Sequence, residues 1–319
     1  MRILFVTSTR IGDAVLSTGL LRHLIERYPQ ARFTIACGAQ AAPLFAAMPN
    51  AERVIVLVKR TRGGHWFKLW VSTVATYWHL VVDLRASALA YLLATRHRMV
   101  LRDRGERVHR VVGLARLAGL TNIPSPRLWT APKQDARALA LVPNGAPLLA
   151  LGPAANWPGK QWPASRFAEL AERLTGPEGI LPGARIVLLG GAGERESVKP
   201  LLATIPGDRR IDLMGGTDLL TAYAVLKRAD FYVGNDSGLM HLAAAAGCPT
   251  LGLFGPSREE HYAPWGERTA VVRTERSYDE LVGAPDYDYR TKESLMDSLS
   301  VDAANAAARE LWVRCRADH

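Results

Sequence analysis

Short runs of apolar and β-branched residues alternate with longer amphipathic segments along the first hundred residues. Between 14 and 28, apolar side chains recur at positions 15, 16, 20, 21, 24 and 25, a helical spacing that predicts a helix. A second helix is predicted at 40–48, and strands are predicted at 3–6, 32–36, 53–58, 80–84 and 99–101. This order predicts a mostly parallel sheet with helices on both faces.

The alternation stops between residues 122 and 147 and then begins again. This segment contains five prolines, a density that disfavours both a helix and a central strand, so we interpret it as a linker. Strands follow at 148–151, 185–189, 210–213, 231–233 and 250–254, and helices at 167–174, 194–203, 219–228, 238–246 and 301–316. Ser300 is the expected N-cap of the last helix. The pattern predicts two successive α/β halves.

The composition is that of an ordinary folded protein, with 48% apolar and 22% charged residues among 319, and the length suits two domains of about 150 residues each. No uncharged apolar run approaches the ~20 residues of a membrane span, and residues 1–6 resemble a strand rather than a signal peptide. Cys37, Cys248 and Cys315 are far apart and lack CxxC spacing. They predict neither a disulfide framework nor a zinc site, and they fit a cytoplasmic protein.

Positive charge is concentrated in the first half of the chain. Residues 1–140 contain 21 Lys and Arg against 7 Asp and Glu, a net charge of +14, whereas residues 141–319 contain 19 against 23, a net charge of −4. We therefore expect an anionic partner to meet the first half.

The first candidate site is the loop 7–13, which follows the first predicted strand and contains Asp13. Ligands of open α/β sheets bind where strands end. This loop lacks the glycines of a GxGxxG phosphate loop, and a carboxylate would repel phosphate. Asp13 can cap the following helix, or it can project into a cleft as a general base.

Two loops of the second half combine glycine-rich turns with one charged side chain each. The loop 152–163 contains Lys160, which is either a solvated lysine or a phosphate contact, and we expect Trp157 and Trp162 to pack the loop. The loop 190–196 contains Glu194, which could accept hydrogen bonds from ribose hydroxyls or cap the following helix.

The segment 233–242 places polar residues at the start of a helix rich in small residues. Asp236 or Ser237 is expected to cap the helix, Gly238 would let a ligand approach the backbone, and His241 lies about one turn further on. The free N–H groups and the positive dipole end of a helix start suit a diphosphate. The alternative is a capped core helix with a buried histidine.

Taken together, these segments resemble glycosyltransferase family 9, the ADP-heptose:lipopolysaccharide heptosyltransferases, nearly end to end. The N-terminal signature is carried by Met1-Arg2-Ile3-Leu4, Ile11-Gly12-Asp13, Leu20-Leu21-Arg22 and Tyr28-Pro29. The donor loop is matched by Lys160-x-Trp162-Pro163 and Phe167-Ala168-Glu169-Leu170-Ala171. The strongest motif comprises Asn235-Asp236-Ser237-Gly238-Leu239-Met240-His241-Leu242-Ala243, Gly247-Cys248-Pro249 and Phe254-Gly255-Pro256, and Tyr262-Ala263-Pro264-Trp265-Gly266 is also similar.

The resemblance implies a GT-B fold, in which two Rossmann-like domains face each other across a central cleft. The implied parts are an acceptor-binding domain at 1–145, a donor-nucleotide-binding domain at 146–300, and a C-terminal helix at 301–319 that could pack back toward the first domain. It implies an inverting transfer with Asp13 as general base and with no cofactor or metal ion required. The matched donor-binding positions are Asn156, Lys160, Glu194, Thr217, Asp236, Ser237, Gly238 and His241. Ala155 departs from the family, where a hydroxyl side chain is common, so no side-chain contact is assigned to it.

The resemblance also gives meaning to the charges. A lysine and helix N–H groups can stabilise a nucleoside diphosphate leaving group without Mg²⁺. The implied partners are an ADP-heptose-type nucleotide sugar and an anionic lipid-linked oligosaccharide, the lipopolysaccharide inner core. We expect a cytoplasmic protein with peripheral contact to the cytoplasmic face of the inner membrane, and no nucleic acid partner.

Candidate acceptor contacts lie in the basic half, at Arg10, Lys59, Arg60 and Arg62. Basic and aromatic residues are interleaved from 59 to 70. This segment is either an interfacial acceptor loop or a solvated basic loop whose aromatic side chains pack into the core.

Two other classes of protein stay open. A GT-B enzyme of another chemistry, such as a sugar-nucleotide epimerase, would need further acids in the cleft, and the first loop offers only Asp13. A basic nucleic-acid-binding protein would fit the isoelectric point near 9.8, but no recognisable DNA- or RNA-binding motif is present.

Overall fold

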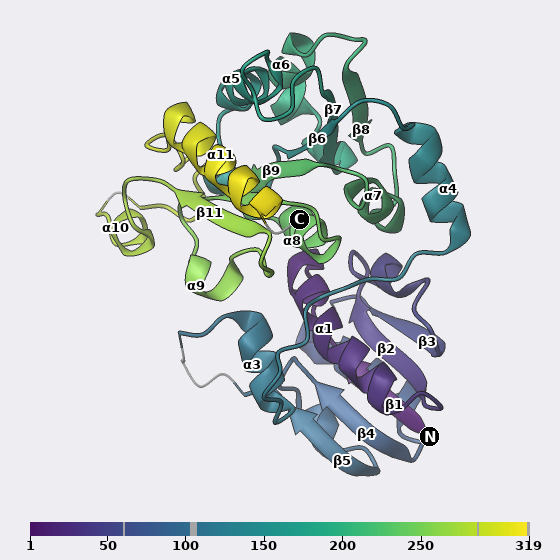
Figure 1. Cartoon of the computed structure of the whole chain (residues 1–319). Coiled ribbons are helices and arrows are strands. Elements are labelled where there is room, and N and C mark those ends of the chain that lie inside the picture. The colour runs from purple at the N-terminus through teal and green to yellow at the C-terminus, as the bar shows by residue number, and fades with distance from the viewer. Residues whose placement is uncertain (60, 103–106, 286, 318–319) are drawn as a thin grey trace. The chain divides into compact units, whose positions relative to one another are not determined.

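The computed structural model describes residues 1–59, 61–102, 107–285 and 287–317. The chain forms two compact units, Met1–Ala131 and Pro132–His319, and each has its own parallel sheet (Figure 1). No helix among the described residues is long and apolar enough to cross a membrane. The fold class expected from the alternating pattern, α/β with two Rossmann-like parts, is confirmed.

The first unit is built on five parallel strands in the order β3-β2-β1-β4-β5. These strands are β1 (Arg2–Val6), β2 (Arg32–Gly38), β3 (Ala51–Leu57), β4 (Trp78–Asp83) and β5 (Thr95–Val100). Ile3 of β1 pairs with Phe33 on one side and with Leu80 on the other. The strand order therefore reverses between β1 and β4, which opens a crevice at their carboxyl ends.

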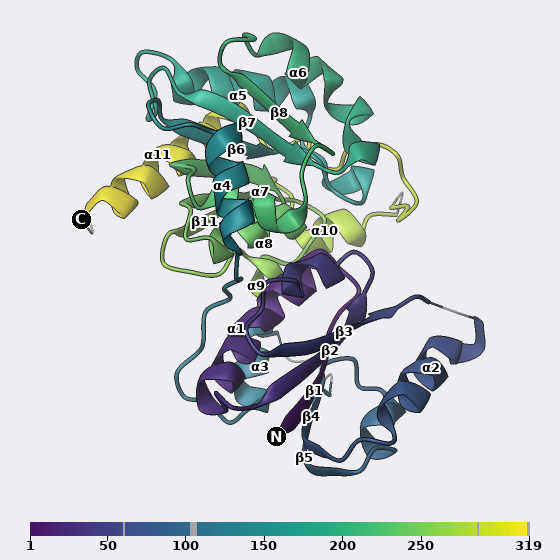
Figure 2. The same ribbon diagram turned by 90° about the vertical axis from the view of Figure 1, so that its right-hand side faces the viewer.

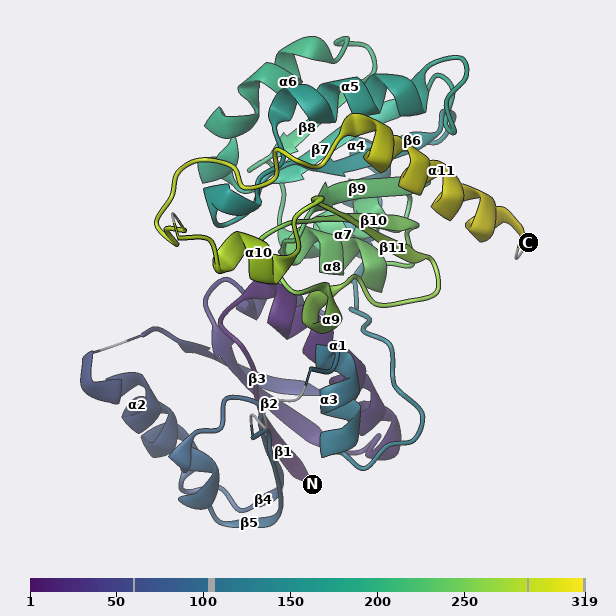
Figure 3. The same cartoon turned by 90° about the vertical axis from the view of Figure 1, so that its left-hand side faces the viewer.

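Helices cover both faces of this sheet, as the alternating pattern predicts. Helices α1 (Ile11–Arg27) and α3 (Arg110–Leu117) lie on one face, and α2 (Gly64–Thr73) lies on the other (Figures 2 and 3). The 3₁₀ turns are η1 (Ala42–Phe45), η2 (Thr61–Gly63) and η3 (Ala88–Tyr91). Helix α1 buries an apolar stripe that includes Val15, Leu20 and Leu24.

The second unit is built on six parallel strands in the order β11-β10-β9-β6-β7-β8. These strands are β6 (Leu148–Gly152), β7 (Arg185–Gly190), β8 (Arg210–Met214), β9 (Phe231–Asn235), β10 (Thr250–Phe254) and β11 (Thr269–Arg273). All five residues of β6, β9 and β10 are buried. Runs without polar alternation are expected where helices cover both faces of a parallel sheet.

The helices of the second unit divide between the two faces. The 3₁₀ turns are η4 (Pro158–Lys160), η5 (Ala192–Glu194) and η6 (Glu196–Val198). The helices are α4 (Pro132–Leu141), α5 (Ala164–Thr175), α6 (Lys199–Thr204), α7 (Leu219–Leu226), α8 (Gly238–Ala245), α9 (Glu259–Tyr262), α10 (Tyr278–Val282) and α11 (Val301–Ala317). Helix α5 packs against α6 and α11, and α7 packs against α4 and α8.

The proline-rich segment is not a structureless linker, because α4 forms inside it. Pro132 stands at the first position of α4, where proline is tolerated since that amide has no partner within the helix. Helix α4 packs on α7, and Lys227 binds Asp135 at 2.8 Å. The division between the units therefore falls after Ala131 rather than at residue 145.

The C-terminal helix begins where the sequence predicts, since the Ser300 hydroxyl accepts a hydrogen bond from the amide of Ala303. Helix α11 lies in the second unit and packs on α5, β10 and β11. Its buried side chains join the core cluster that contains Leu149 and Phe167.

Two predicted helices are wrong in extent. At 40–48 the structure has only the 3₁₀ turn η1, which contains Pro43. At 194–203 it has η5, η6 and the short α6, and Pro200 lies at the start of α6. In both places a proline lacks the amide that a continuous helix would need. The sequence pattern also does not predict helices α2, α3, α4, α9 and α10 or strand β11.

Candidate functional site

The candidate donor site lies at the carboxyl edge of the second sheet. Strand β6 is paired with β7 on one side and with β9 on the other, so the strand order reverses between β6 and β9. Ligands of such sheets bind in the crevice at this reversal. The two loops that the sequence singled out most strongly, 152–163 and 236–238, leave the sheet from these two adjacent strands.

Lys160 and Asp236 meet at this edge. Lys160 closes the turn η4 after β6, and its Nζ atom donates to Asp236 Oδ2 at 2.5 Å. The side chains are only 24% and 8% exposed. Lys160 is therefore a fixed side chain rather than a solvated one, and the carboxylate of Asp236 is bound to it instead of capping α8.

Helix α8 begins beside this pair with its first amides uncapped by a side chain. Ser237 occupies the N-cap position, but its hydroxyl makes no capping hydrogen bond. Gly238 is the first helical residue, and His241 is 4% exposed one turn later. Ser237 is thus the N-cap residue, as expected, but its side chain makes no capping hydrogen bond, and the Asp236 carboxylate is bound to Lys160. Amides at a helix start that no side chain caps, next to a lysine, suit an anion such as a diphosphate.

Asn235 ties the two loops together. It is fully buried at the end of β9, where its amide nitrogen donates to the carbonyl of Pro153 at 2.7 Å and its side-chain oxygen accepts from the amide of Trp162 at 3.1 Å. As expected, Trp162 packs the loop, and its indole donates to the carbonyl of Leu299. Asn235 is not among the site residues that the sequence predicts, although a carboxamide at the end of an apolar strand is a usable signal.

Tyr232 of β9 lies next to the residue that begins α8. A Cβ atom placed on Gly152 or Gly234 would lie 2.0 or 2.3 Å from its hydroxyl oxygen, so the ring needs glycine at both positions. The hydroxyl is buried next to the Ser237 hydroxyl. Burial raises the pKa of Tyr232 above its usual value, which keeps the phenol protonated.

Glu194 and Thr217 lie in the loops that follow β7 and β8 at the same edge. Glu194 Oε2 accepts from the amide of Gly191 at 2.7 Å, so its carboxylate caps the turn η5. Gly215, with a φ of +71°, brings the second loop against the first, and its amide donates to the carbonyl of Gly190. Thr217 is half-buried.

Asn156 is exposed in the loop between β6 and η4. Among the donor residues expected from the sequence, Lys160 and Asp236 are in direct contact in the described part of the chain. The others share the edge of the sheet with this pair.

In the first unit, Asp13 lies at the third position of α1, after β1. Arg10 is the N-cap residue, and no side chain caps this helix, so the interpretation of Asp13 as the N-cap is wrong. The Asp13 carboxylate is half-buried and accepts from the Ser8 hydroxyl at 3.3 Å. A single long hydrogen bond leaves this carboxylate able to accept others.

The expected acceptor contacts are only partly described. Arg10 and Lys59 are exposed. Arg60 lies outside the described residues, and Arg62 is in η2 without a described side chain. The aromatic segment that follows is helix α2, in which Trp66 and Trp70 pack against the core while Phe67 is 66% exposed.

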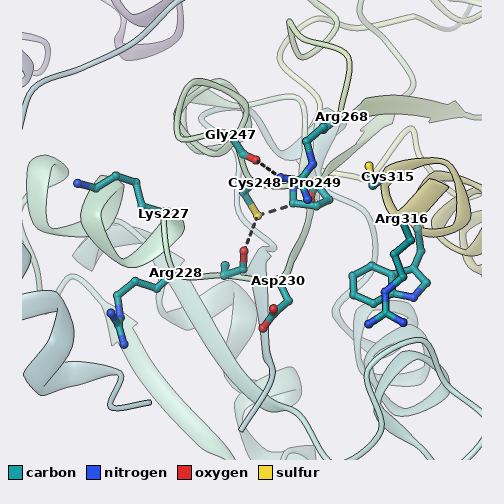
Figure 4. Close-up of a pocket in the computed structure, with 11 residues that line it drawn as sticks. Lys227, Arg228, Asp230, Gly247, Cys248, Pro249, Arg268, Cys315 and Arg316 are labelled. Carbon is teal, nitrogen blue, oxygen red and sulfur yellow. Dashed lines mark hydrogen bonds between the residues drawn. The ribbon is translucent and has the colours of Figure 1, made fainter. Parts of the chain in front are cut away.

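A hollow of about 350 Å³ lies at the opposite, amino-terminal edge of the second sheet (Figure 4). Its cations are engaged in contacts within the chain: Arg228 binds the carbonyl of Val142, and Arg316 stacks on Trp312. Cys248 and Cys315 line it as free, buried thiols. None of the site residues expected from the sequence lies in this hollow.

The described residues contain no group of three or more His, Cys, Asp or Glu side chains that could hold a metal ion. The donor edge presents a lysine, helix amides and hydroxyls. Such groups bind and orient an anionic nucleotide by hydrogen bonds and charge.

Comparison with known proteins assigns this arrangement to a class. The model of glycosyltransferase family 9 (heptosyltransferase) matches residues 59–286. The chain is 28% identical to lipopolysaccharide heptosyltransferase 2 of Salmonella typhimurium, over 88% of this chain and 90% of that one.

Two solved structures share the fold over almost their whole length. The ADP-heptose heptosyltransferase II of Escherichia coli has a TM-score of 0.76 at 23% identity. The match covers 99% of this chain and 100% of that chain. The family 9 glycosyltransferase of Veillonella parvula has a TM-score of 0.80 at 21% identity. The match covers 98% of this chain and 97% of that chain.

The family match and the shared fold thus define the class of this chain as a two-domain glycosyltransferase. The chain belongs to glycosyltransferase family 9. This membership decides among the three classes that the sequence left open, in favour of a glycosyl-transferring enzyme over an epimerase or a nucleic-acid-binding protein.

Proposed function

We propose that this enzyme transfers a heptose from an ADP-heptose-type donor to the inner core of lipopolysaccharide, with inversion at the anomeric carbon. The observation that carries the proposal is the Lys160–Asp236 pair beside the uncapped start of α8. Membership of the family and the activities named for the relatives support the choice of sugar and acceptor.

The donor half of the mechanism rests on charge stabilisation. When the bond between the anomeric carbon and the diphosphate breaks, its electron pair leaves with ADP, and negative charge grows on the diphosphate. Lys160 and the amides of Ser237 and Gly238 would stabilise that charge without a metal ion. His241 would contact the same end of the donor from one turn further along α8.

The nucleoside would extend along the edge of the sheet. Thr217 would lie near the adenine, and Glu194 would use its second carboxylate oxygen for the ribose. Asn156 would contact the donor from the loop after β6.

The acceptor half needs a base, because a sugar hydroxyl is far too weakly acidic to react as a free alkoxide. Asp13 would take the proton as the acceptor oxygen bonds to the anomeric carbon on the face opposite ADP. A single displacement of this kind inverts the configuration. Arg10, Lys59, Arg60 and Arg62 would bind the phosphates and carboxylates of the acceptor.

The proposed setting is the cytoplasm, with peripheral contact to the cytoplasmic face of the inner membrane, where a lipid-linked acceptor is embedded. The net charge of +14 over residues 1–140 would attract such a surface. No nucleic acid partner is proposed.

A direct test combines donor selection with product analysis. Thermal shift with ADP, ADP-heptose, UDP-sugars and GDP-sugars should give stabilisation by the adenine nucleotides. Transfer to an inner-core acceptor that lacks heptose should then yield a product of inverted anomeric configuration by NMR, in buffer containing EDTA. Stabilisation by UDP- or GDP-sugars alone, or retained configuration, would contradict the proposal.

A further inference from the structure

The first unit exposes an unusual number of apolar side chains in one part of its sequence. Of thirteen large apolar side chains that the described residues expose, eight lie between 56 and 92. Single exposed apolar residues are normal, whereas a gathering of them marks an interaction site. Among the described residues of the second unit, the comparable side chains are the widely separated Leu139, Tyr289 and Val313.

Helix α2 organises this part of the surface. Leu69 and Thr73 are buried and Trp66 and Trp70 pack on the core cluster, so one face of the helix covers the sheet. Beside that face, Phe67 and Val71 are 66% and 54% exposed. Positions four residues apart lie on one side of a helix, so these two form a second, outward stripe, which Val74 continues.

The segment around η3 extends the stripe. The indole of Trp70 donates to the carbonyl of Leu92 at 3.4 Å, which holds this segment beside α2. Tyr91 and Leu92 are 55% and 63% exposed there, and Tyr77, just after the helix, is 69% exposed. We call these six residues the α2 surface: Phe67, Val71, Val74, Tyr77, Tyr91 and Leu92.

The sequence segment that contains the α2 surface is strongly basic. Residues 53–102 contain nine Lys and Arg and one carboxylate, Asp83. Asp83 is fully buried, where it accepts hydrogen bonds from the amides of Arg85 and Ser87. Residues 53–102 therefore supply no exposed carboxylate to offset their cations.

Several of these cations adjoin the apolar side chains directly. Lys68 is exposed on α2 itself. The Arg85 guanidinium lies over the ring of Trp66 at 5.7 Å, and Arg102 donates to the Tyr91 hydroxyl at 3.0 Å. Apolar and aromatic side chains rimmed by basic ones are the composition of surfaces that insert into the headgroup region of an anionic bilayer.

We infer that the α2 surface docks the enzyme on an anionic lipid bilayer, with Phe67 and Val71 inserted among the headgroups and the adjoining cations paired with lipid phosphates. The inference deepens the proposed function by naming the surface that makes the membrane contact. Charge complementarity selects lipid over a second copy of this chain, because two such basic surfaces would repel each other.

The test is sedimentation of the full chain with vesicles of phosphatidylcholine alone and with 30% phosphatidylglycerol. The unaltered protein should bind only the anionic vesicles, and rising salt should weaken binding. Phe67→Glu and Val71→Glu should each lower the partition coefficient by about tenfold or more. Lys68→Ala should lower it by about fivefold, the equivalent of ~1 kcal/mol per basic residue.

Val313→Glu is the matched control, since Val313 is 68% exposed on α11 of the second unit, and it should bind vesicles like the unaltered protein. An equal loss of vesicle binding in Val313→Glu, or unchanged vesicle binding in Phe67→Glu and Val71→Glu, would overturn the inference. A dimer that these two substitutions convert to a monomer would also overturn it, because a second copy would then cover the surface. Affinity for ADP, measured separately, reports on the proposed donor site alone.

Discussion

The two units share one architecture but hold their loops in different ways. In each, the strand order reverses beside the first strand of the unit, between β1 and β4 and between β6 and β9. In the second unit, side chains cross-link the loops at this reversal through Asn235 and through Lys160 with Asp236. In the first unit, Asp13 has one 3.3 Å contact with Ser8. Side chains and amides that are held in place suit the stabilisation of a negatively charged leaving group. A carboxylate with one long hydrogen bond suits proton transfer.

The largest expected effect is on Asp13. Asp13→Asn keeps the shape but cannot accept the proton, so turnover should fall by about 10²–10⁴-fold. Because Arg10 and not Asp13 is the N-cap of α1, the melting temperature and ADP affinity should stay close to those of the unaltered protein. Transfer kinetics, calorimetric titration with ADP and thermal unfolding would measure the three quantities.

Ser8→Ala is the control for Asp13, because it removes only the hydrogen-bonding partner. It should change turnover far less than Asp13→Asn. Near-normal turnover in Asp13→Asn would exclude Asp13 as the general base. It would not bear on the proposed donor site.

The next effect concerns the cross-link in the second unit. Asn235→Ala would leave a buried amide and a buried carbonyl without their partners, at a cost of ~1–3 kcal/mol for each group. Stability and ADP affinity should fall together, because the loop that carries Lys160 would loosen. Asn305→Ala is a matched control: its side-chain oxygen is buried without a partner, so its removal should be close to neutral. Equal free energies of unfolding for Asn235→Ala and Asn305→Ala, measured with denaturant, would argue against cross-linking by Asn235.

A smaller effect is expected at Lys160. Lys160→Ala should weaken ADP binding by roughly 10- to 100-fold, because a charge-assisted hydrogen bond contributes ~1.5–3 kcal/mol. It also leaves the Asp236 carboxylate, 8% exposed, without its cation. Adding Asp236→Asn should therefore recover part of the lost affinity.

Lys199→Ala controls for the loss of one positive charge, since Lys199 is 65% exposed and forms an ion pair with Glu196 on the surface of the second unit. Titration calorimetry should find its ADP affinity unchanged. An unaltered dissociation constant in Lys160→Ala would exclude Lys160 from the donor site.

Much of the fold and of the candidate sites in the two units can be predicted from the sequence, and the wrong predictions have physical causes. Local pattern locates β10 at 250–254 and the strand ends that carry Asp13, Lys160 and Asp236, because burial makes strands continuously apolar. It misses α4, since Pro132 is disruptive within a helix but acceptable at its start. It also misses the role of Asn235, whose partners Pro153 and Trp162 lie more than 70 residues away. Long-range hydrogen bonds leave no periodic signal in a single sequence.

The smallest effect concerns the starts of two particular helices, α7 of the second unit and α1 of the first. Helix α7 is capped by Asp218, whose carboxylate accepts from the amides of Leu220 and Thr221 at 3.0 Å and from the Thr221 hydroxyl at 2.6 Å, whereas α1 has no side-chain cap. Partial burial favours the neutral acid, but these hydrogen bonds outweigh it and lower the pKa of Asp218 below its usual 3.8. A depressed carboxyl pKa stabilises the fold at pH values above 3.8, and that contribution is lost as the pH falls through the folded-state value.

Asp218→Ala should therefore cost ~1 kcal/mol at neutral pH, and the difference from the unaltered protein should shrink below about pH 4 as the carboxylate is protonated. Asp13→Ala should show no such loss, since Asp13 caps nothing. Hydrogen exchange of the α7 and α1 amides at pH 7 and pH 3 would resolve the two helices within one molecule. A penalty for Asp218→Ala that is the same at both pH values would mean that packing rather than the charged cap holds the start of α7.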